Sequence, residues 1–167
     1  NVDAARWLVE AIMPQVWATH PQARLALVGA NPTADVLALA GERVEVTGFV
    51  SDDALARRYR HARVAVVPLR YGAGVNSKVV EALQQGLPLV TTTVGAQGLP
   101  GVVAACSVAD DVTGIAAGIV RLLDDDAAWL RCSRDGSAYA AAHFSADAMR
   151  RDLLSALAIG TRAEHSA

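Results

Sequence analysis

Short apolar runs alternate with amphipathic segments along this chain, and this alternation limits most strongly the folds that it can adopt. The apolar runs cover residues 24–29, 44–50, 63–68 and 87–93, with a weaker one at 102–108. Nearly continuous apolar runs of this length are typical of parallel strands that are buried on both faces. Strands that alternate with helices predict a parallel sheet covered by helices on both sides. We therefore predict an α/β fold, a Rossmann-like domain of three layers.

Helices are expected between these runs and after the last of them. Residues 2–19 carry apolar side chains at helical spacing; Asn1 or Asp3 can cap this helix, and Pro14 predicts a kink or an early end. The other expected helices cover residues 33–40, 51–61, 77–85, 111–123 and 127–142, followed by an amphipathic segment with Ala146, Met149, Leu153 and Leu157 on one face. A parallel alternation normally opens on a strand, so we expect a piece of chain before Asn1.

Composition excludes several classes of protein. The 167 residues suit one domain with a sizeable core, and 53% hydrophobic against 19% charged residues exclude a disordered chain. A net charge of -2 argues against a nucleic-acid binder that relies on a basic surface. No apolar run reaches membrane-spanning length, and the first ten residues lack a signal-peptide pattern.

Cysteine and arginine usage indicate the compartment and the source. Cys106 and Cys132 are too few and too far apart for a metal knuckle or a disulfide framework, so we expect a reducing cytoplasm. Of the 15 basic residues only Lys78 is a lysine, and the other 14 are arginines. Such a bias is typical of a GC-rich genome, and we expect a bacterial source.

The loop after the third apolar run concentrates glycine and polar residues, and a helix is expected to begin at Ser77. Amides at a helix N-terminus carry partial positive charge and bind anions, typically phosphate. Ser77 can add a hydroxyl group, and Lys78 an ammonium group that shares a helix face with Glu81. A cation and a carboxylate one turn apart suit the phosphate and the sugar hydroxyls of a nucleotide. The candidate binding residues are Gly72, Gly74, Val75, Asn76, Ser77, Lys78 and Glu81.

A simpler interpretation of this loop stays open. Glycines often serve only a tight turn, and Lys78 with Glu81 can form a solvated pair worth about 0.2–0.5 kcal/mol. The position of the lone lysine favours the binding site, because the 14 residues 69–82 would contain it by chance roughly one time in twelve.

Other known nucleotide and catalytic patterns fit poorly. Residues 72–77 approach G-x-G-x-x-G but end in serine, follow the third run, and lack an acidic residue about twenty positions on, which argues against a dehydrogenase. The Walker pattern of NTPases is absent. The acidic groups at 52–53, 110–111 and 124–126 stand at expected helix starts, so we interpret them as caps. The four histidines are isolated, which favours surface roles.

The run that starts at Pro68, PLRYGAGVNSKVVEALQQGLPLVTTTVGAQGL, resembles the donor-binding segment of the GT-B glycosyltransferases of family 4. The segments HPQARLALVG, VTGFVSD and IVRLLDDD occur in the family's order, so the resemblance covers nearly the whole chain. It implies the C-terminal half of a GT-B fold. It also implies an enzyme that transfers a sugar, with retention, from a nucleotide-diphosphate donor to an acceptor hydroxyl, without a cofactor or a metal.

The resemblance also assigns roles to residues. In the family the glycine-loop amides hold the donor diphosphate, and the helix glutamate, here Glu81, binds the ribose hydroxyls. The loop after the Gly-Phe-Val strand, here Phe49 and Val50, lies against the base. Ala73 stands where many members have a glutamate that contacts the transferred sugar. The sugar, the base, the acceptor, the oligomeric state and the catalytic residues therefore stay open.

Parts of such an enzyme lie outside this sequence. The family's phosphate-binding Arg and Lys precede the region present, and so does the acceptor-binding N-terminal domain. We expect residues 1–167 to be a nucleotide-sugar-binding domain, truncated at its N-terminus and inactive alone. Its expected partners are the nucleotide-sugar donor, a glycan, lipid or small-molecule acceptor, and the N-terminal domain of the same enzyme, but no nucleic acid. The full-length enzyme would be cytoplasmic, and a peripheral place at the inner membrane is compatible with the resemblance.

Two alternatives from other classes remain. One is another nucleotide-sugar enzyme of the same architecture, such as a 2-epimerase, which would need catalytic carboxylates and a histidine near the cleft. The other is a non-catalytic nucleotide-binding or scaffolding module in which the glycine loop is only a turn.

Overall fold

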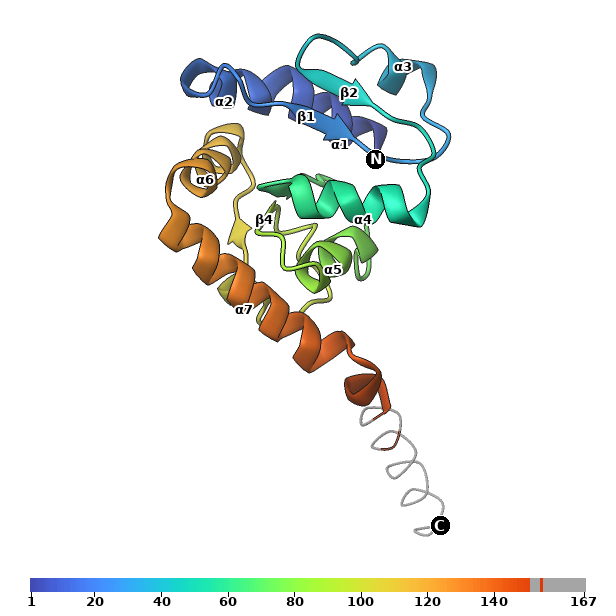
Figure 1. Cartoon of the computed structure of the whole chain (residues 1–167), viewed down its shortest axis with the longest axis vertical. Coiled ribbons are helices and arrows are strands. Elements are labelled where there is room, and N and C mark those ends of the chain that lie inside the picture. The colour runs from blue at the N-terminus through green and yellow to red at the C-terminus, as the bar shows by residue number, and fades with distance from the viewer. Residues whose placement is uncertain (151–153, 155–167) are drawn as a thin grey trace.

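The computed structural model describes residues 1–150 and Leu154, and helices alternate with strands along them as the sequence predicts (Figure 1). The strands are β1 (Leu25–Leu27), β2 (Val44–Val46), β3 (Ala65–Val67), β4 (Leu89–Thr91) and β5 (Ser107–Val108). The helices are α1 (Val2–Trp7), α2 (Met13–Thr19), α3 (Ala34–Leu37), α4 (Asp52–His61), α5 (Ser77–Gln84), α6 (Val112–Asp124) and α7 (Asp126–Phe144). Two short segments, η1 (Leu8–Ile12) and η2 (Val102–Ala104), complete the described elements.

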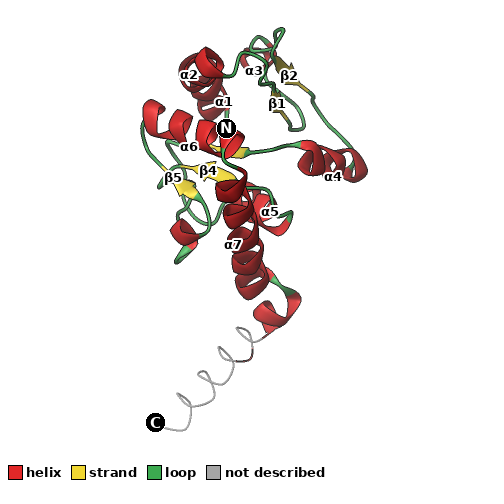
Figure 2. Ribbon diagram, turned by 60° about the vertical axis from the view of Figure 1, so that its left-hand side comes forward, coloured by secondary structure: helices red, strands yellow, loops and turns green. Residues whose placement is uncertain are grey.

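All described strands are parallel, and they form two sheets. β1 pairs with β2, with Leu25 opposite Val44, and the second sheet has the order β3-β4-β5. Figure 2 shows β1 and β2 apart from β4 and β5. The strand pattern predicted the parallel strands and their helices correctly, but it did not predict this division.

Helices cover both faces of the β3-β4-β5 sheet, and a hydrophobic cluster fills each interface. On one face α1, η1, α2 and α6 surround a cluster that includes Ile12, Val16, Ile115 and Leu122, all of which are fully buried. On the other face α5 and α7 enclose Val79, Leu83, Leu89 and Ala140. Consecutive residues of β4 point to opposite faces, so Val90 joins the first cluster and Leu89 the second. The helices and the sheet thus form the predicted three layers.

The first helical stretch adapts to its proline. Residues 2–19 are helical as predicted, but the segment η1, directly before α2, is a wider π-helix. Pro14 therefore lies in the first turn of α2, where a missing N–H group costs little. Asn1 is the N-cap of α1 without a side-chain hydrogen bond, and Asp3 pairs with Arg70 instead, so neither predicted cap acts through its side chain.

The prediction of a fifth strand over residues 102–108 is wrong in its first half. Gly101 has a φ angle of 78° and starts a 3₁₀ turn, η2, that buries Val102 in the cluster beneath α5 and α7. Only Ser107 and Val108 pair with β4. The local structure of residues 102–104 thus follows from the burial of Val102 and not from the strand propensity of its valines.

Five of the helices named above begin with a side-chain cap, and these caps set the point at which each loop ends. The capping residues are Thr33, Ser51, Asn76, Asp111 and Asp125. The interpretation of the acidic groups as caps is confirmed for Asp111 and Asp125. Asp110 instead accepts hydrogen bonds from the N–H and hydroxyl groups of Thr93, which lower the pKa of Asp110.

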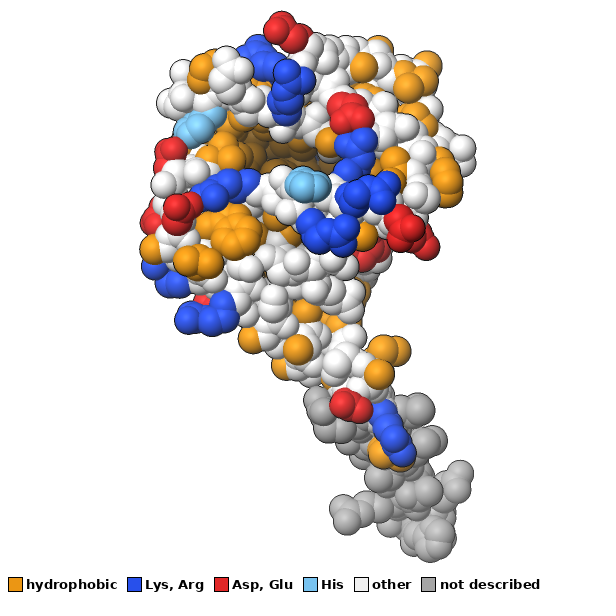
Figure 3. Space-filling model, viewed as in Figure 1, with side chains coloured by type: hydrophobic (Ala, Val, Ile, Leu, Met, Phe, Trp, Pro, Cys, Tyr) orange, Lys and Arg blue, Asp and Glu red, His pale blue; other side chains and the backbone are white. Residues whose placement is uncertain are grey.

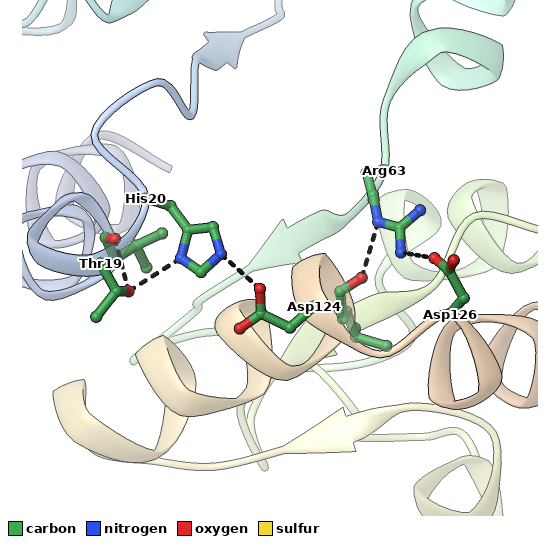
Figure 4. Close-up of polar contacts among 7 residues, drawn as sticks. Thr19, His20, Arg63, Asp124 and Asp126 are labelled. Atoms are coloured by element: carbon green, nitrogen blue, oxygen red, sulfur yellow. Dashed lines mark hydrogen bonds and ion pairs between the residues drawn. The ribbon is translucent and has the colours of Figure 1, made fainter.

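Polar contacts join the segments that precede β1 and β3 to the end of α6 and the start of α7, at the edge where the strands begin (Figure 4). The His20 Nε2 atom lies 2.8 Å from a carboxylate oxygen of Asp124, so the end of α2 contacts the end of α6. Arg63, just before β3, donates from Nε to the carbonyl of Leu122 and forms an ion pair with Asp126. His20, for which the sequence favoured a surface role, therefore makes a structural contact between two helices.

The expected amphipathic segment after α7 lies partly outside the described residues. Residues 146–150 are helical, and Met149 is 65% exposed, whereas Leu153 and Leu157 are among the residues that are not described. None of the described helices combines the length and the hydropathy that a membrane-spanning helix needs.

Candidate functional site

A large cavity, which we call the central cavity, lies between β1 and β3 and has a volume of about 1070 Å³. It extends along both strands and reaches Gly29 and Leu69 beyond their carboxyl ends, the edge where ligands bind in parallel α/β sheets. Four of the candidate residues line it: Phe49, Val50, Lys78 and Glu81. Figure 3 shows this hollow between the part that contains β1 and β2 and the part that contains the β3-β4-β5 sheet. Hydrophobic side chains lie inside the hollow, and charged side chains surround it.

The glycine loop lies beside this cavity and leads into α5. Gly72, Gly74, Val75, Asn76 and Ser77 do not line the cavity wall. Gly74 has a φ angle of 81°, in the left-handed region that favours glycine. The conformation of the turn is therefore one reason for a glycine at this position. The sequence therefore located the loop and the helix start, and the structure places them at the rim of the cavity.

The start of α5 offers free backbone donors. The Asn76 side chain accepts from the N–H group of Lys78 at 2.9 Å, which fixes the first turn. In the described part of the chain, the N–H groups of Gly74, Val75, Asn76 and Ser77 donate to no other group. Such donors at a helix N-terminus favour an anionic ligand.

Lys78 and Glu81 lie one turn apart on α5 and both face the central cavity. No ion pair joins them, and Lys78 has no carboxylate partner among residues 1–150. The structure thus shows no Lys78–Glu81 ion pair of the kind in the simpler interpretation, although Gly74 has the turn conformation that this interpretation expects. The lysine remains available for a negatively charged ligand.

Tyr59, on α4, is a site residue that the sequence did not indicate. Its hydroxyl donates to the Glu81 carboxylate at 3.3 Å and so holds the side chain of Glu81 against the cavity wall. Burial, together with the negative charge of Glu81, raises the pKa of Tyr59 to about 12. Tyr59 thus keeps its proton, and its role as a donor, far above neutral pH.

This shift predicts a titration at high pH. Tyr59 should ionise with a midpoint of about 12 in absorbance at 295 nm, and Tyr59→Phe should remove that transition. A raised pKa in the folded state stabilises the protein below pH 10, and this contribution is lost as the pH rises toward 12. Glu81→Gln should lower the midpoint without restoring the ordinary value, because burial remains. An unchanged midpoint in Glu81→Gln would contradict the contact.

Two buried threonines after β4 fix the start of the glycine loop. Thr91 and Thr92, both at most 2% exposed, donate their hydroxyl hydrogens to the carbonyls of Val67 and Leu69 at the end of β3. The Thr92 hydroxyl also accepts from the N–H group of Gly95 at 3.0 Å. The two strand ends are therefore tied together where the loop leaves the sheet.

The turn after β4 contacts the glycine loop directly. A Cβ atom at Gly98, whose φ angle is 76°, would lie 3.0 Å from the Cγ2 atom and 3.3 Å from the backbone nitrogen of Val75. Glycine at position 98 thus permits this close approach. The sequence contained the residue but no pattern that could pair it with Val75.

Arg70 fastens the same loop to α1. Its guanidinium donates to the carboxylate of Asp3 at 3.0 Å and a second, shorter bond joins the same groups. It also lies over the rings of Trp7, at 5.1 Å, and Tyr71, at 5.9 Å. The bonds to Arg70 lower the pKa of Asp3, so the pair stays charged at neutral pH. Trp7 thus forms part of this contact.

Two aromatic side chains remain exposed near the mouth. Phe49 is 79% exposed and Tyr71 is 74% exposed. Gly48, with a φ angle of 68°, makes the turn that presents Phe49 after β2. Exposed rings at the rim of a cavity are suited to contact with a planar ligand group.

Other chemistry is sparse at this site. Within the described residues, no group of three or more His, Cys, Asp or Glu side chains is placed to hold a metal ion. Burial raises the pKa of the Cys106 thiol to about 11, so it is not a thiolate nucleophile at neutral pH. His61 lines the central cavity, but from the end of α4 at the edge where β3 begins, opposite the glycine loop.

Comparisons with known proteins agree with this architecture. The chain is similar in structure to sucrose-phosphate synthase from Thermosynechococcus elongatus, with a TM-score of 0.71 and 25% sequence identity. The match covers 95% of this chain and 43% of that protein, so the chain spans less than half the length of this relative. A search of curated proteins gives no match. The family model described as glycosyl transferases group 1 matches residues 1–125. The chain therefore belongs to the group 1 glycosyltransferases, with the Rossmann-like architecture of a GT-B fold.

Proposed function

We propose that this domain binds the nucleotide-diphosphate part of a sugar donor at the mouth of the central cavity. The whole enzyme would transfer the sugar to an acceptor hydroxyl with retention. The observation that supports this most directly is that Lys78 and Glu81 line the same cavity, next to the free N–H groups of residues 74–77, and that Lys78 has no carboxylate partner among residues 1–150. This combination offers positive charge for phosphate and a carboxylate for sugar hydroxyls.

Each group has a distinct part in the proposed reaction. Negative charge builds up on the diphosphate as its bond to the sugar breaks, and the Lys78 ammonium with the amides of residues 74–77 would stabilise that charge. Glu81, oriented by Tyr59, would accept hydrogen bonds from the ribose hydroxyls and position the donor without reacting. Protein donors that neutralise the leaving group would make a metal ion unnecessary.

The loop after β2 would contact the base. Phe49 is exposed and Val50 half-buried at the cavity wall, on the far side of the mouth from α5. A ring beside a planar base gains stacking energy, about 1–3 kcal/mol in nucleic-acid complexes. The base and the sugar are left open, since Ala73 offers no polar group to the sugar.

The remaining partners follow from the proposed reaction. The N-terminal domain of the same enzyme would supply the acceptor site, and the acceptor would be a glycan, a lipid or a small molecule. We propose a cytoplasmic bacterial enzyme, and we propose that this domain alone is inactive because one side of its reaction cleft lies in the other domain.

Binding of UDP, GDP and ADP, measured by calorimetry, tests the site. Lys78→Ala and Glu81→Ala should each weaken the affinity for the preferred diphosphate by roughly tenfold or more, because each removes a charged hydrogen-bonding partner worth about 1.5–3 kcal/mol. Arg57→Ala removes an exposed cation of α4 that does not line the cavity, and it should leave the affinity unchanged.

Two results would contradict the proposal. Unaltered affinity in both site variants would mean that the diphosphate binds elsewhere. Absence of stabilisation by any nucleotide or nucleotide sugar in a thermal-shift screen would favour the scaffolding alternative, in which the glycine loop is only a turn.

A further inference from the structure

The backbone of residues 70–75 in the glycine loop is held by no hydrogen bond within the part of the chain that the structure describes. The side chain of Arg70 anchors the start of this segment to α1, and the cap formed by Asn76 fixes its end. Between these two points, Gly72 and Gly74 allow many backbone conformations. The positions of the free N–H groups must therefore be set by contacts with another part of the chain.

The turn after β4, residues 92–99, is by contrast firmly held. The Thr92 hydroxyl accepts from the N–H group of Gly95 at 3.0 Å and donates to a carbonyl group just after β3. The Thr92 carbonyl accepts from the N–H group of Ala96 at 2.9 Å. Leu99 donates its N–H group to the carbonyl of Ala96 at 3.2 Å, and its side chain is buried in the cluster beneath α5 and α7. The turn is therefore a rigid support beside the loop.

This turn touches the glycine loop at two points. A Cβ atom at Gly72 would lie 3.8 Å from the Cγ1 atom of Val94, which is an ordinary van der Waals contact. A Cβ atom at Gly98 would lie 3.0 Å from the Cγ2 atom and 3.3 Å from the backbone nitrogen of Val75, and 3.5 Å from the carbonyl carbon of Gly74. The peptide group between Gly74 and Val75, whose N–H group is one of the free donors, thus lies directly against Gly98.

We propose that the turn after β4 sets the positions of the free amides in the glycine loop, and that Gly98 is the residue through which it acts. Gly98 is a positioning residue, because it acts through the Gly74–Val75 peptide group and not by touching a ligand. Donors that are fixed in advance need not be ordered when an anion binds, so their placement affects the affinity. The identity of the anion as a donor diphosphate rests on the proposed function, whereas the contact itself does not.

A side chain at position 98 would displace the loop and not the turn. Val75 is 52% exposed and has space to move outward, whereas the turn is anchored by Thr92 and Leu99, which are 2% and 4% exposed. Movement of Val75 carries its N–H group with it and changes the direction of the neighbouring donors. The substitution therefore acts on the anion-binding groups before it disturbs the core.

Gly98→Ala and Gly101→Ala form a matched pair of variants. The φ angles of the two glycines are 76° and 78°, so alanine is similarly strained at both, but a Cβ atom at Gly101 meets no atom within 4 Å. Both variants should lose thermal stability from this strain. Only Gly98→Ala should shift the amide NMR signals of residues 74–77 in the free domain. Calorimetry should show that only Gly98→Ala weakens the affinity for the preferred diphosphate among UDP, GDP and ADP, by about tenfold, as for the loss of one hydrogen bond to a charged group.

Removal of the Val75 side chain provides a rescue. Val75→Ala keeps the backbone amide and deletes the Cγ2 atom that a side chain at position 98 would meet first. Relative to Val75→Ala alone, the added Gly98→Ala substitution should lower the affinity by only about threefold, because residues in contact are energetically coupled. A purely structural effect of the strained alanine would be the same with and without the valine side chain.

Each result decides the inference. Shifted amide signals in Gly98→Ala but not in Gly101→Ala, together with rescue by Val75→Ala, support it. The inference is overturned by unshifted signals in Gly98→Ala, by equal affinity in the two glycine variants, or by an equal loss in both backgrounds at position 75. If none of the three nucleotides binds the unaltered domain, the proposed function fails, and the amide signals alone decide whether Gly98 positions the loop. If the inference fails instead, the losses of affinity in Lys78→Ala and Glu81→Ala remain.

Discussion

Replacement of Leu122 by alanine is expected to lower the free energy of unfolding by about 2–5 kcal/mol. Leu122 is completely buried in the cluster that α6 shares with η1 and α2. Truncation loses the transfer free energy of the side chain and leaves a cavity in a cluster against which Leu25 and Leu27 of β1 and Val66 of β3 also pack. Because no strand pairing joins the two sheets in the described part of the chain, this cluster is a principal connection between them.

Urea denaturation followed by circular dichroism provides the measurement. Leu130→Ala is a matched control, because Leu130 is a helical leucine of α7 that is 62% exposed. The control should change the free energy of unfolding by at most about 0.5 kcal/mol. If both variants are equally stable, the packing of α6 against α2 contributes little to the fold.

Gly95→Ala is expected to be the second large effect, a loss of about 3 kcal/mol. A Cβ atom at this buried position would lie 2.1 Å from the Thr91 hydroxyl oxygen and 3.0 Å from the Val67 carbonyl. The hydroxyl cannot turn away freely, because it is buried and donates to that same carbonyl at 2.8 Å. Overpacking costs about 1–3 kcal/mol, and loss of the hydrogen bond adds to it.

Thermal unfolding should show a melting temperature lower by roughly 6–12 °C for Gly95→Ala. Gly41→Ala is the control, since a Cβ atom there meets no atom within 4 Å and the φ angle is not in the left-handed region. The site should respond as well, because Thr91 fixes the end of β3 from which the glycine loop departs. A melting temperature equal to that of Gly41→Ala would mean that the turn shifts away from Thr91 at no cost.

The loop and helix that form the candidate site could be predicted because their signals are local. Glycines, a cap and a lysine follow one another between residues 72 and 78, and Ser77 begins α5 as expected. The contacts of Tyr59 with Glu81, and of Gly98 with Val75, join residues more than twenty positions apart in sequence. No local pattern encodes such a pair, so these positioning residues emerged only from the packed structure.

The sequence by itself determined the parallel α/β class, the positions of the main helices and the loop beside the sheet edge, because burial periodicity and capping act over a few residues. Only the tertiary structure decided that the described strands form two sheets, that Lys78 has no carboxylate partner among residues 1–150, and that Tyr59 contacts Glu81. Strand pairing and cavity shape depend on how elements distant in sequence approach one another. Hydrophobic patterns specify which face of an element is buried but not which neighbour covers it.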